Sequence, residues 1–102
     1  MAVIEFDING IVLRANDNFL SVVNYQSDDI VGKHHRIFVE ESYANSHDYK
    51  NFWKTLSEGN YLFGEYLRIG KDGKEVWIQA SYNPILDKKG RVVKIVKYAL
   101  GV

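Results

Sequence analysis

Two adjacent histidines, His34 and His35, are the residues of this 102-residue chain whose type and position come closest to supporting chemistry. A neutral imidazole is a common axial ligand of haem iron. Because neighbouring side chains point in different directions, one ring can face a cavity while the other faces solvent. The alternative is a structural pair, in which one histidine lies at the surface and the other anchors a loop through hydrogen bonds.

The other polar residues form no recognisable catalytic site, so we expect no enzyme and assign no catalytic residue. No serine lies in a nucleophile elbow, and the absence of cysteine excludes a thiolate nucleophile and Cys-based zinc or iron–sulfur sites. The segment 71–74 holds one glycine and is typical of a hairpin rather than a phosphate-binding loop. The two histidines with Glu40 or Glu41 match no known metal-ligand spacing.

Five strands are expected from alternating hydrophobicity and turn residues, at 3–8, 11–14, 62–69, 75–83 and 91–100. The pairs Asn9-Gly10 and Asp72-Gly73, and more weakly Lys89-Gly90, favour type I′ hairpin turns, in which both central residues need a positive φ. In the first strand, one face is expected to carry Ile4, Phe6 and Ile8. In the fourth strand, Trp77 is expected on the face opposite Ile78, turned away from the helices. There it is covered by a flanking helix or a second subunit, or it is a lone exposed aromatic residue.

Helical signals lie between the second and third strands. Asn16 is a favourable N-cap for a helix that runs to about Asn24, and residues 27–32 indicate a short turn closed by glycine. Ser46 precedes the strongest helical pattern, which Gly59 ends. Its apolar stripe consists of Tyr49, Phe52, Trp53 and Leu56. This order predicts an α+β domain in which helices cover one face of an antiparallel sheet.

Length and charge restrict the functional classes. A chain of 102 residues is the size of one domain. Thirteen basic and thirteen acidic side chains cancel, so we expect no binding to nucleic acid or to an anionic membrane. No apolar run reaches the length of a membrane span. The absence of cysteine leads us to expect a cytoplasmic protein. Because strand patterns begin and end the chain, we also expect a domain excised from a longer protein.

The order and spacing of several short motifs resemble a PAS sensory domain over the whole chain. The most typical stretch is Gly70–Ile78, and the other matching stretches are 6–12, 15–19, 25–32, 52–59, 82–85 and Asp87. Three pieces resemble most closely the PAS domains of bacterial methyl-accepting chemotaxis proteins and aerotaxis receptors. They are Gly32-Lys33-His34-His35, Phe52-Trp53 and Val76-Trp77-Ile78.

The resemblance implies a five-stranded antiparallel sheet in spatial order 2-1-5-4-3, with short helices between strands two and three. It also implies a regulatory input module, most typical of a chemotaxis transducer, that binds a small molecule or cofactor and signals to a separate output domain. The partner would be a second copy, a neighbouring PAS domain or a coiled-coil segment. The expected cavity residues are His34, His35, Phe38, Tyr43, Phe52, Leu62, Ile78, Tyr82 and Ile95.

Two departures from the family pattern argue against binding of a flavin cofactor. Flavin-binding aerotaxis domains carry an Arg-His-Pro-Asp-like stretch where this chain has residues 39–42, and a tryptophan where Leu62 or Phe63 stands. If a cofactor is bound, we therefore expect haem b rather than FAD, with His34 or His35 on the iron. The exit segment 99–102 lacks the usual Asp-Ile-Thr-like signal. Two alternatives stay open, namely a cofactor-free dimerisation module and a haem-based oxygen or redox sensor.

Overall fold

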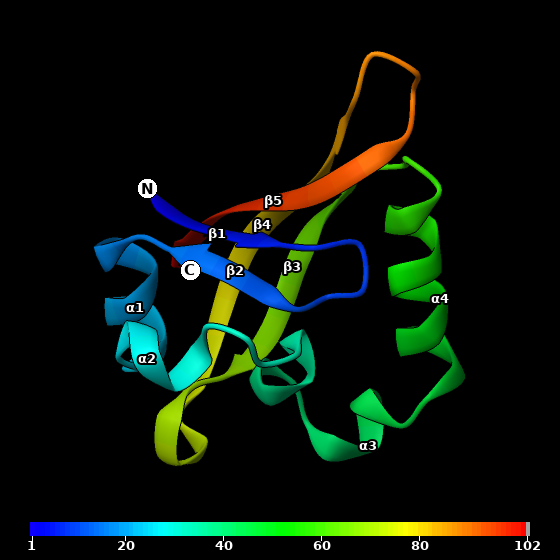
Figure 1. Cartoon of the computed structure of the whole chain (residues 1–102). Coiled ribbons are helices and arrows are strands. Elements are labelled where there is room, and N and C mark those ends of the chain that lie inside the picture. Colours follow the sequence, from blue (N-terminus) through cyan, green and yellow to red (C-terminus); the bar gives the residue numbers. More distant parts are fainter. Residues whose placement is uncertain (102) are drawn as a thin grey trace.

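The computed structural model describes residues 1–101 as one antiparallel sheet with helices on one face (Figure 1). The strands are β1 (Ala2–Phe6), β2 (Val12–Ala15), β3 (Leu62–Ile69), β4 (Glu75–Leu86) and β5 (Val92–Gly101). Their spatial order is β2-β1-β5-β4-β3, so the expected fold is confirmed. Val102, the last residue of the altered exit segment, lies outside the described residues.

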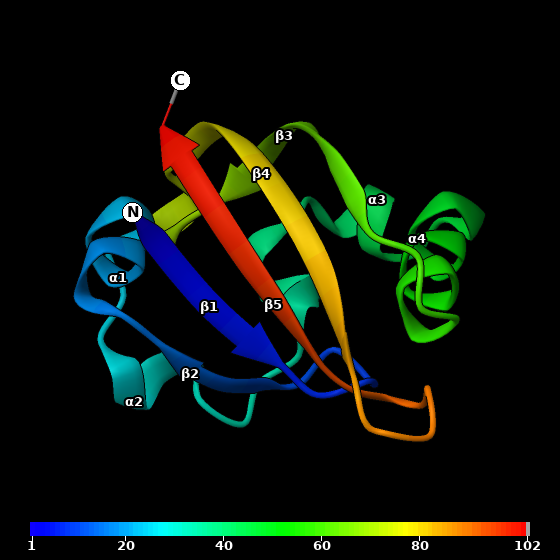
Figure 2. The same cartoon turned by 90° about the horizontal axis from the view of Figure 1, so that it is seen from above.

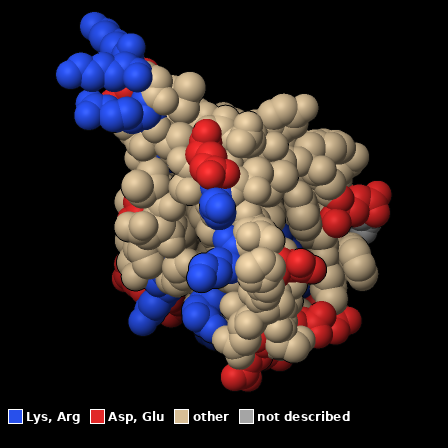
Figure 3. Space-filling view, turned by 90° about the vertical axis from the view of Figure 1, so that its right-hand side faces the viewer, with Lys and Arg blue, Asp and Glu red and all other residues tan. Residues whose placement is uncertain are grey.

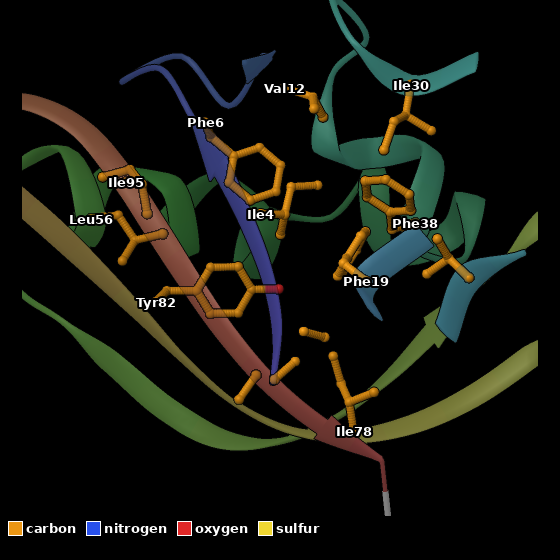
Figure 4. Close-up of a cluster of buried hydrophobic side chains, with 14 of the residues drawn as sticks. Ile4, Phe6, Val12, Phe19, Ile30, Phe38, Leu56, Ile78, Tyr82 and Ile95 are labelled. Atoms are coloured by element: carbon orange, nitrogen blue, oxygen red, sulfur yellow. The ribbon is translucent and has the colours of Figure 1, made fainter. Parts of the chain in front are cut away.

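The inner face of the sheet and the helices enclose the hydrophobic core (Figure 4). Along β4 the side chains alternate as predicted, with Ile78, Ala80 and Tyr82 buried and Trp77 exposed. Ile4 and Phe6 extend the core along β1. Side chains that point inward from the middle of the sheet are removed from water.

Five helical segments connect β2 to β3: α1 (Asp17–Val23), α2 (Ser27–Ile30), the 3₁₀ turn η1 (His35–Phe38), α3 (Glu41–Ala44) and α4 (His47–Ser57). The predicted caps are confirmed. The side-chain oxygens of Asn16 and Ser46 accept hydrogen bonds from the backbone N–H groups of Phe19 and Tyr49, respectively. These bonds satisfy N–H groups that have no partner within the helix.

The long helix α4 faces the core with its predicted stripe. Tyr49, Phe52 and Leu56 are buried, and Trp53 is partly buried against the same cluster. Gly59 follows the helix with a φ of 94°, and its N–H donates to the carbonyl oxygen of Leu56. The left-handed backbone at this position favours glycine and turns the chain toward β3.

The predictions of type I′ turns at Asn9-Gly10 and Lys89-Gly90 are wrong. Among the described residues, only Asn24 and Asp72 combine a side chain with a positive φ, so Asn9 and Lys89 are not left-handed. Both loops instead close around an aspartate. The carboxylate oxygen of Asp7 accepts from the N–H groups of Asn9 and Ile11, and Asp87 acts in the same way in its own loop. The Asp72-Gly73 prediction is confirmed, because both residues have a positive φ.

Two further strand predictions need correction. Ile8 lies outside β1 in the Asp7 loop and is 43% exposed, so it does not belong to the core. Pro84 lies within β4, opposite Ile95, rather than after the strand. The hairpin that follows projects from the sheet, and basic side chains gather at its tip (Figure 3). These are the exposed residues Lys88, Lys89 and Arg91.

Among residues 1–101, no helix is long and apolar enough to cross a membrane.

Candidate functional site

The core contains five polar side chains that contact one another, and we call them the buried polar cluster. They are His35, Tyr49, Arg68, Tyr82 and Lys97. Each comes from a different element, namely η1, α4, β3, β4 and β5. Polar groups in a core are costly unless they have partners, so this cluster is the most unusual feature of the interior.

Strand pairing brings three members of the cluster together. Tyr82 and Lys97 are directly opposite each other in the β4–β5 register, so their side chains lie on the same inner face. On β3 the inward positions are Leu62, Gly64, Tyr66 and Arg68. The Tyr82 ring extends from β4 into the interior, with its hydroxyl toward the middle of the core (Figure 4). His35 and Tyr49 approach from the helical side.

A chain of hydrogen bonds crosses the cluster. The Tyr82 hydroxyl accepts from Nε and Nη2 of Arg68, at 3.2 and 3.0 Å, and lies 2.9 Å from Nε2 of His35. Nδ1 of His35 lies 2.7 Å from the Tyr49 hydroxyl. Since both lone pairs of the Tyr82 oxygen are used, its O–H donates to Nε2. His35 is therefore the tautomer with its proton on Nδ1, which donates to Tyr49.

Burial and positive charge control protonation in the cluster. Burial lowers the pKa of His35 well below its usual range, and the charges of Arg68 and Lys97 lower it further. The imidazole is therefore neutral, as the hydrogen-bond chain requires. Burial raises the pKa of Tyr82 to about 12 and that of Tyr49 above its ordinary value. Neither phenol supplies a negative charge to the cluster at neutral pH.

The two cations of the cluster have no carboxylate partner. Arg68 is 4% exposed and Lys97 is 1% exposed. Within residues 1–101 the ion pairs involve Glu5 and Asp87, and neither buried cation takes part in one. Burial of an ion costs several kcal/mol in a real protein. Burial, and then the charge of Arg68, accordingly lower the pKa of Lys97 well below its usual range.

Aromatic rings offset part of the free-energy cost of burying the two basic side chains. The Arg68 guanidinium lies 4.5 Å from the centroid of Tyr66 and 5.8 Å from that of Tyr82. The Lys97 ammonium lies 4.8 Å from the centroid of Tyr82 and 5.5 Å from that of Phe19. Such contacts contribute about 2 kcal/mol when desolvated. Both side chains thus share one ring, that of Tyr82. Contact with aromatic rings does not offset the whole cost of burying either of them.

An open cavity of about 410 Å³ leads to Arg68. It lies between the η1–α3 segment and the edge strand β3. Its lining residues are Val39, Glu40, Tyr43, Glu65, Tyr66, Leu67, Arg68 and Trp77. A volume of this size suits a small molecule. Because only Arg68 belongs both to the cavity wall and to the buried polar cluster, it connects a potential ligand to the core.

The predicted cavity residues are distributed differently. Tyr43 lines this cavity. His34 is half-buried beside the first hairpin, where its Nδ1 accepts from the N–H of Arg36. Burial and the Arg36 charge lower its pKa. Leu62 packs against the core as a partly buried residue. The other predicted residues are buried in the core: His35, Phe38, Phe52, Ile78, Tyr82 and Ile95.

The surroundings of His35 do not fit axial ligation of haem iron. Both ring nitrogens are hydrogen-bonded to tyrosine hydroxyls, so neither is free for a metal. Aromatic side chains enclose the ring, with the centroids of Phe6 and Trp53 each 5.3 Å away. Over the described part of the chain, no group of three or more His, Asp or Glu side chains is arranged to hold a metal ion.

Sequence reasoning missed Arg68, Lys97 and Tyr49 as site residues. The alternation along the strands could have identified the two basic residues. Arg68 is two positions from Tyr66 and Lys97 is two positions from Ile95, so each lies on the same, inward face as that neighbour. A charged residue at an inward position of a strand is unusual, whether on the edge strand β3 or on the central strand β5. Tyr49 was assigned only to the helix stripe.

Comparison with known proteins agrees with this architecture. A family model described as "PAS fold" matches residues 12–99. The biofilm dispersion protein BdlA of Pseudomonas aeruginosa is 44% identical over 97% of this chain and 24% of its own length. The bacterioopsin transcriptional activator of Halobacterium salinarum is 28% identical over 89% of this chain and 13% of its own length. The chain thus spans a quarter or less of these relatives.

Solved structures share the fold at low sequence identity. A PAS domain from Colwellia psychrerythraea superposes with a TM-score of 0.84 at 17% identity, covering 99% of this chain and 85% of that one. An RNA-binding light-oxygen-voltage receptor superposes with a TM-score of 0.85 at 21% identity, covering 99% of this chain and 29% of that one. Together with the family match over residues 12–99, the sheet order and its helical insert lead to one conclusion: the chain belongs to the PAS family.

Proposed function

We propose that this PAS domain is a sensory input module of a bacterial signalling protein of the chemotaxis-transducer type. It binds a small molecule in the cavity beside β3 and passes the change to an output domain. The 44% identity to BdlA supports a bacterial signalling context. The module acts by binding and switching and catalyses no reaction. It works in the cytoplasm without contacting nucleic acid or membrane.

The observation that carries this proposal is the position of Arg68. Its side chain lines the cavity and donates two hydrogen bonds to Tyr82 in the middle of the core. A ligand that changes the position of the guanidinium must also change these bonds. Because interiors are closely packed, the displacement is transmitted rather than absorbed.

The strand β5 offers a route from the core toward the end of the domain. Lys97 lies on β5 opposite Tyr82, and the same strand continues to Gly101. Ala2 of β1 pairs with Ala99 of β5, so the N-terminus lies beside the end of β5 (Figure 2). A shift at Tyr82 and Lys97 therefore reaches the end of β5, beside the start of β1.

Amide hydrogen exchange tests the proposal. The domain is first screened by thermal unfolding against small metabolites of negative, neutral and positive charge. With a compound that raises Tm, we expect slower exchange at the cavity wall in β3 and also at residues 96–100 of β5. Protection limited to the cavity wall would contradict signalling through β5. If no compound of any charge raised Tm, the sensory function itself would be contradicted.

A second candidate function is dimerisation without a ligand, and the outer face of the sheet favours it. This face carries the exposed apolar side chains Phe63, Trp77, Tyr98 and Leu100. Exposed apolar side chains gathered on one sheet face are typical of a protein contact. The occupant would be a second copy, a neighbouring PAS domain or a coiled-coil segment. The cavity and this face share Trp77, with its β3 partner Leu67 beside it, and the other side chains of each are different.

A further inference from the structure

The charge balance of the core points to the chemical class of the ligand. Arg68 and Lys97 contribute two basic groups to the interior, and the ion pairs of residues 1–101 leave both without a carboxylate. The phenols of Tyr49 and Tyr82 stay neutral because burial raises their pKa values. The charge of the Arg68 guanidinium therefore has no internal counterion, and an anion from outside would supply one.

We infer that the cavity beside β3 binds a small organic monoanion, with its charged oxygens at the Arg68 guanidinium and its apolar body between Tyr43 and Tyr66. This inference rests on the small-molecule function proposed above and specifies its ligand. The class includes carboxylates and other singly charged oxyanions. Arg68 is the binding residue, and Lys97 lies 4.8 Å from the centroid of the Tyr82 ring, which Arg68 also contacts.

The guanidinium has donors left for such a ligand. It has five N–H groups. Nε and Nη2 donate to Tyr82, and Nη1 donates to the carbonyl oxygen of Leu67. One N–H therefore remains on each terminal nitrogen. Two N–H groups on a planar fork match the two oxygens of a carboxylate. Because Tyr82 and Leu67 already hold the fork in place, it is ordered before the ligand arrives.

The lining of the cavity limits the charge and shape of the ligand. Tyr43, Tyr66 and Trp77 offer aromatic surface to an apolar body. Glu40 and Glu65 also line the cavity and are exposed. Their carboxylates repel a group with several negative charges, such as a di- or triphosphate. A single charge on an apolar body fits both the buried cation and the acidic rim.

The experiment measures binding of charged and neutral analogues to the same chain. The probes are aliphatic and aromatic monocarboxylates of two to ten carbons, each paired with its uncharged amide, together with inorganic phosphate and sulfate. Binding is followed by Tm and by calorimetric titration. We expect at least one carboxylate to raise Tm while its amide does not, and phosphate and sulfate to bind more weakly than that carboxylate.

Variants locate the binding site. Arg68→Met should weaken carboxylate binding by about tenfold or more, since a charge-assisted pair is lost. Lys89→Met removes the same charge from the exposed hairpin tip and should leave binding unchanged. Glu40→Gln removes a repelling charge at the rim and should tighten binding by about two- to threefold. Because Glu40 is exposed, this variant remains informative if Arg68→Met fails to fold.

Each contrary result overturns a defined part of the inference. Equal binding of amides and carboxylates would show a neutral ligand and would leave the sensory function intact. Phosphate or sulfate binding as tightly as the carboxylates would exclude the role of the apolar body. Carboxylate binding that neither Arg68→Met nor Glu40→Gln changes would place the ligand elsewhere. Failure of every organic probe, charged or neutral, would count against the sensory function as well.

Discussion

His35 shows how a residue selected for possible metal chemistry can serve a structural role. Its two nitrogens join α4 to β4 through Tyr49 and Tyr82, and its ring is fully buried. The neutral form suits this position, since Nε2 accepts a hydrogen bond from the Tyr82 hydroxyl and the N–H of Nδ1 donates one to Tyr49. Protonation would replace an acceptor with a donor next to Tyr82 and add a positive charge near the Arg68 guanidinium. Folding and the protonation of His35 are therefore coupled.

The first prediction is that His35 makes the domain sensitive to mild acid. The pKa of His35 is lower in the folded state than the ordinary value of 6.5. Below pH 6.5 the unfolded chain binds a proton that the folded chain does not, so stability falls as pH falls. The difference in unfolding free energy between wild type and His35→Gln should shrink by up to about 1.4 kcal/mol per pH unit. Urea titrations at pH 7.5, 6.5, 5.5 and 5.0 measure it.

A matched control separates this effect from other titrations. His47 is exposed at the start of α4, so His47→Gln keeps the buried imidazole and should lose stability in acid as the wild type does. A His35→Gln variant with the same acid dependence as the wild type would show that protonation of His35 is not coupled to folding.

The second prediction is that Lys97 makes the stability of the domain depend on pH on the alkaline side. Its pKa is well below the ordinary value of 10.5 in the folded state. Between the lowered value and 10.5, the unfolded chain holds a proton that the folded chain lacks, and wild-type stability rises with pH. Lys97→Met keeps much of the volume and removes the ionisable group, so it should be more stable than wild type near neutral pH. Urea denaturation at pH 7 and pH 9.5 checks both statements, and a destabilised Lys97→Met would contradict them.

At the scale of elements, local signals predicted the fold and non-local contacts determined the site. The caps Asn16 and Ser46 and the alternation along β4 depend on neighbouring residues, so the pattern identified them correctly. The hairpin turn at Asn9-Gly10 was wrong because the Asp7 carboxylate competes with the expected turn through its own hydrogen bonds. The cluster at Tyr82 joins five elements, and no local pattern carries its geometry.

The β3–β4 hairpin also depends on a close contact that only the structure reveals. The backbone of Gly70 has an ordinary φ of −89°, so its conformation alone does not demand glycine. A β-carbon at this position would, however, lie 2.6 Å from the carbonyl oxygen of Val23 at the end of α1. Because backbone atoms meet there, the contact cannot be relieved by rotating a side chain. The hairpin and α1 must therefore separate to accept any larger residue.

Gly70→Ala should accordingly destabilise the domain by about 1–3 kcal/mol, as expected for overpacking. Gly101→Ala is the matched control, since Gly101 also lacks a positive φ and a β-carbon there would meet no atom within 4 Å. That control should change stability by less than about 0.5 kcal/mol. Urea denaturation of both variants measures the difference. Equal stabilities for the two variants would indicate that α1 moves freely relative to the hairpin.

At the scale of the whole molecule, the two faces of the sheet differ in what covers them. Helices cover the inner face, whereas the outer face presents Trp77, which is 55% exposed, together with Phe63, Tyr98 and Leu100. Trp77 lies opposite Leu67 in the β3–β4 register, which extends the apolar surface toward the edge strand. Apolar surface of this kind gains free energy when another surface removes it from water.

The last prediction is that the domain self-associates through this outer face. Trp77→Gln should shift the monomer–dimer equilibrium toward monomer, because the indole supplies much of the exposed apolar surface. Tyr61→Gln is the matched control: Tyr61 is 69% exposed but precedes β3, so its loss should leave association unchanged. Sedimentation velocity from micromolar to millimolar concentration distinguishes the two variants. A wild-type chain that stays monomeric over this range would remove self-association from the proposal, and equal effects of both substitutions would place the contact outside the sheet face.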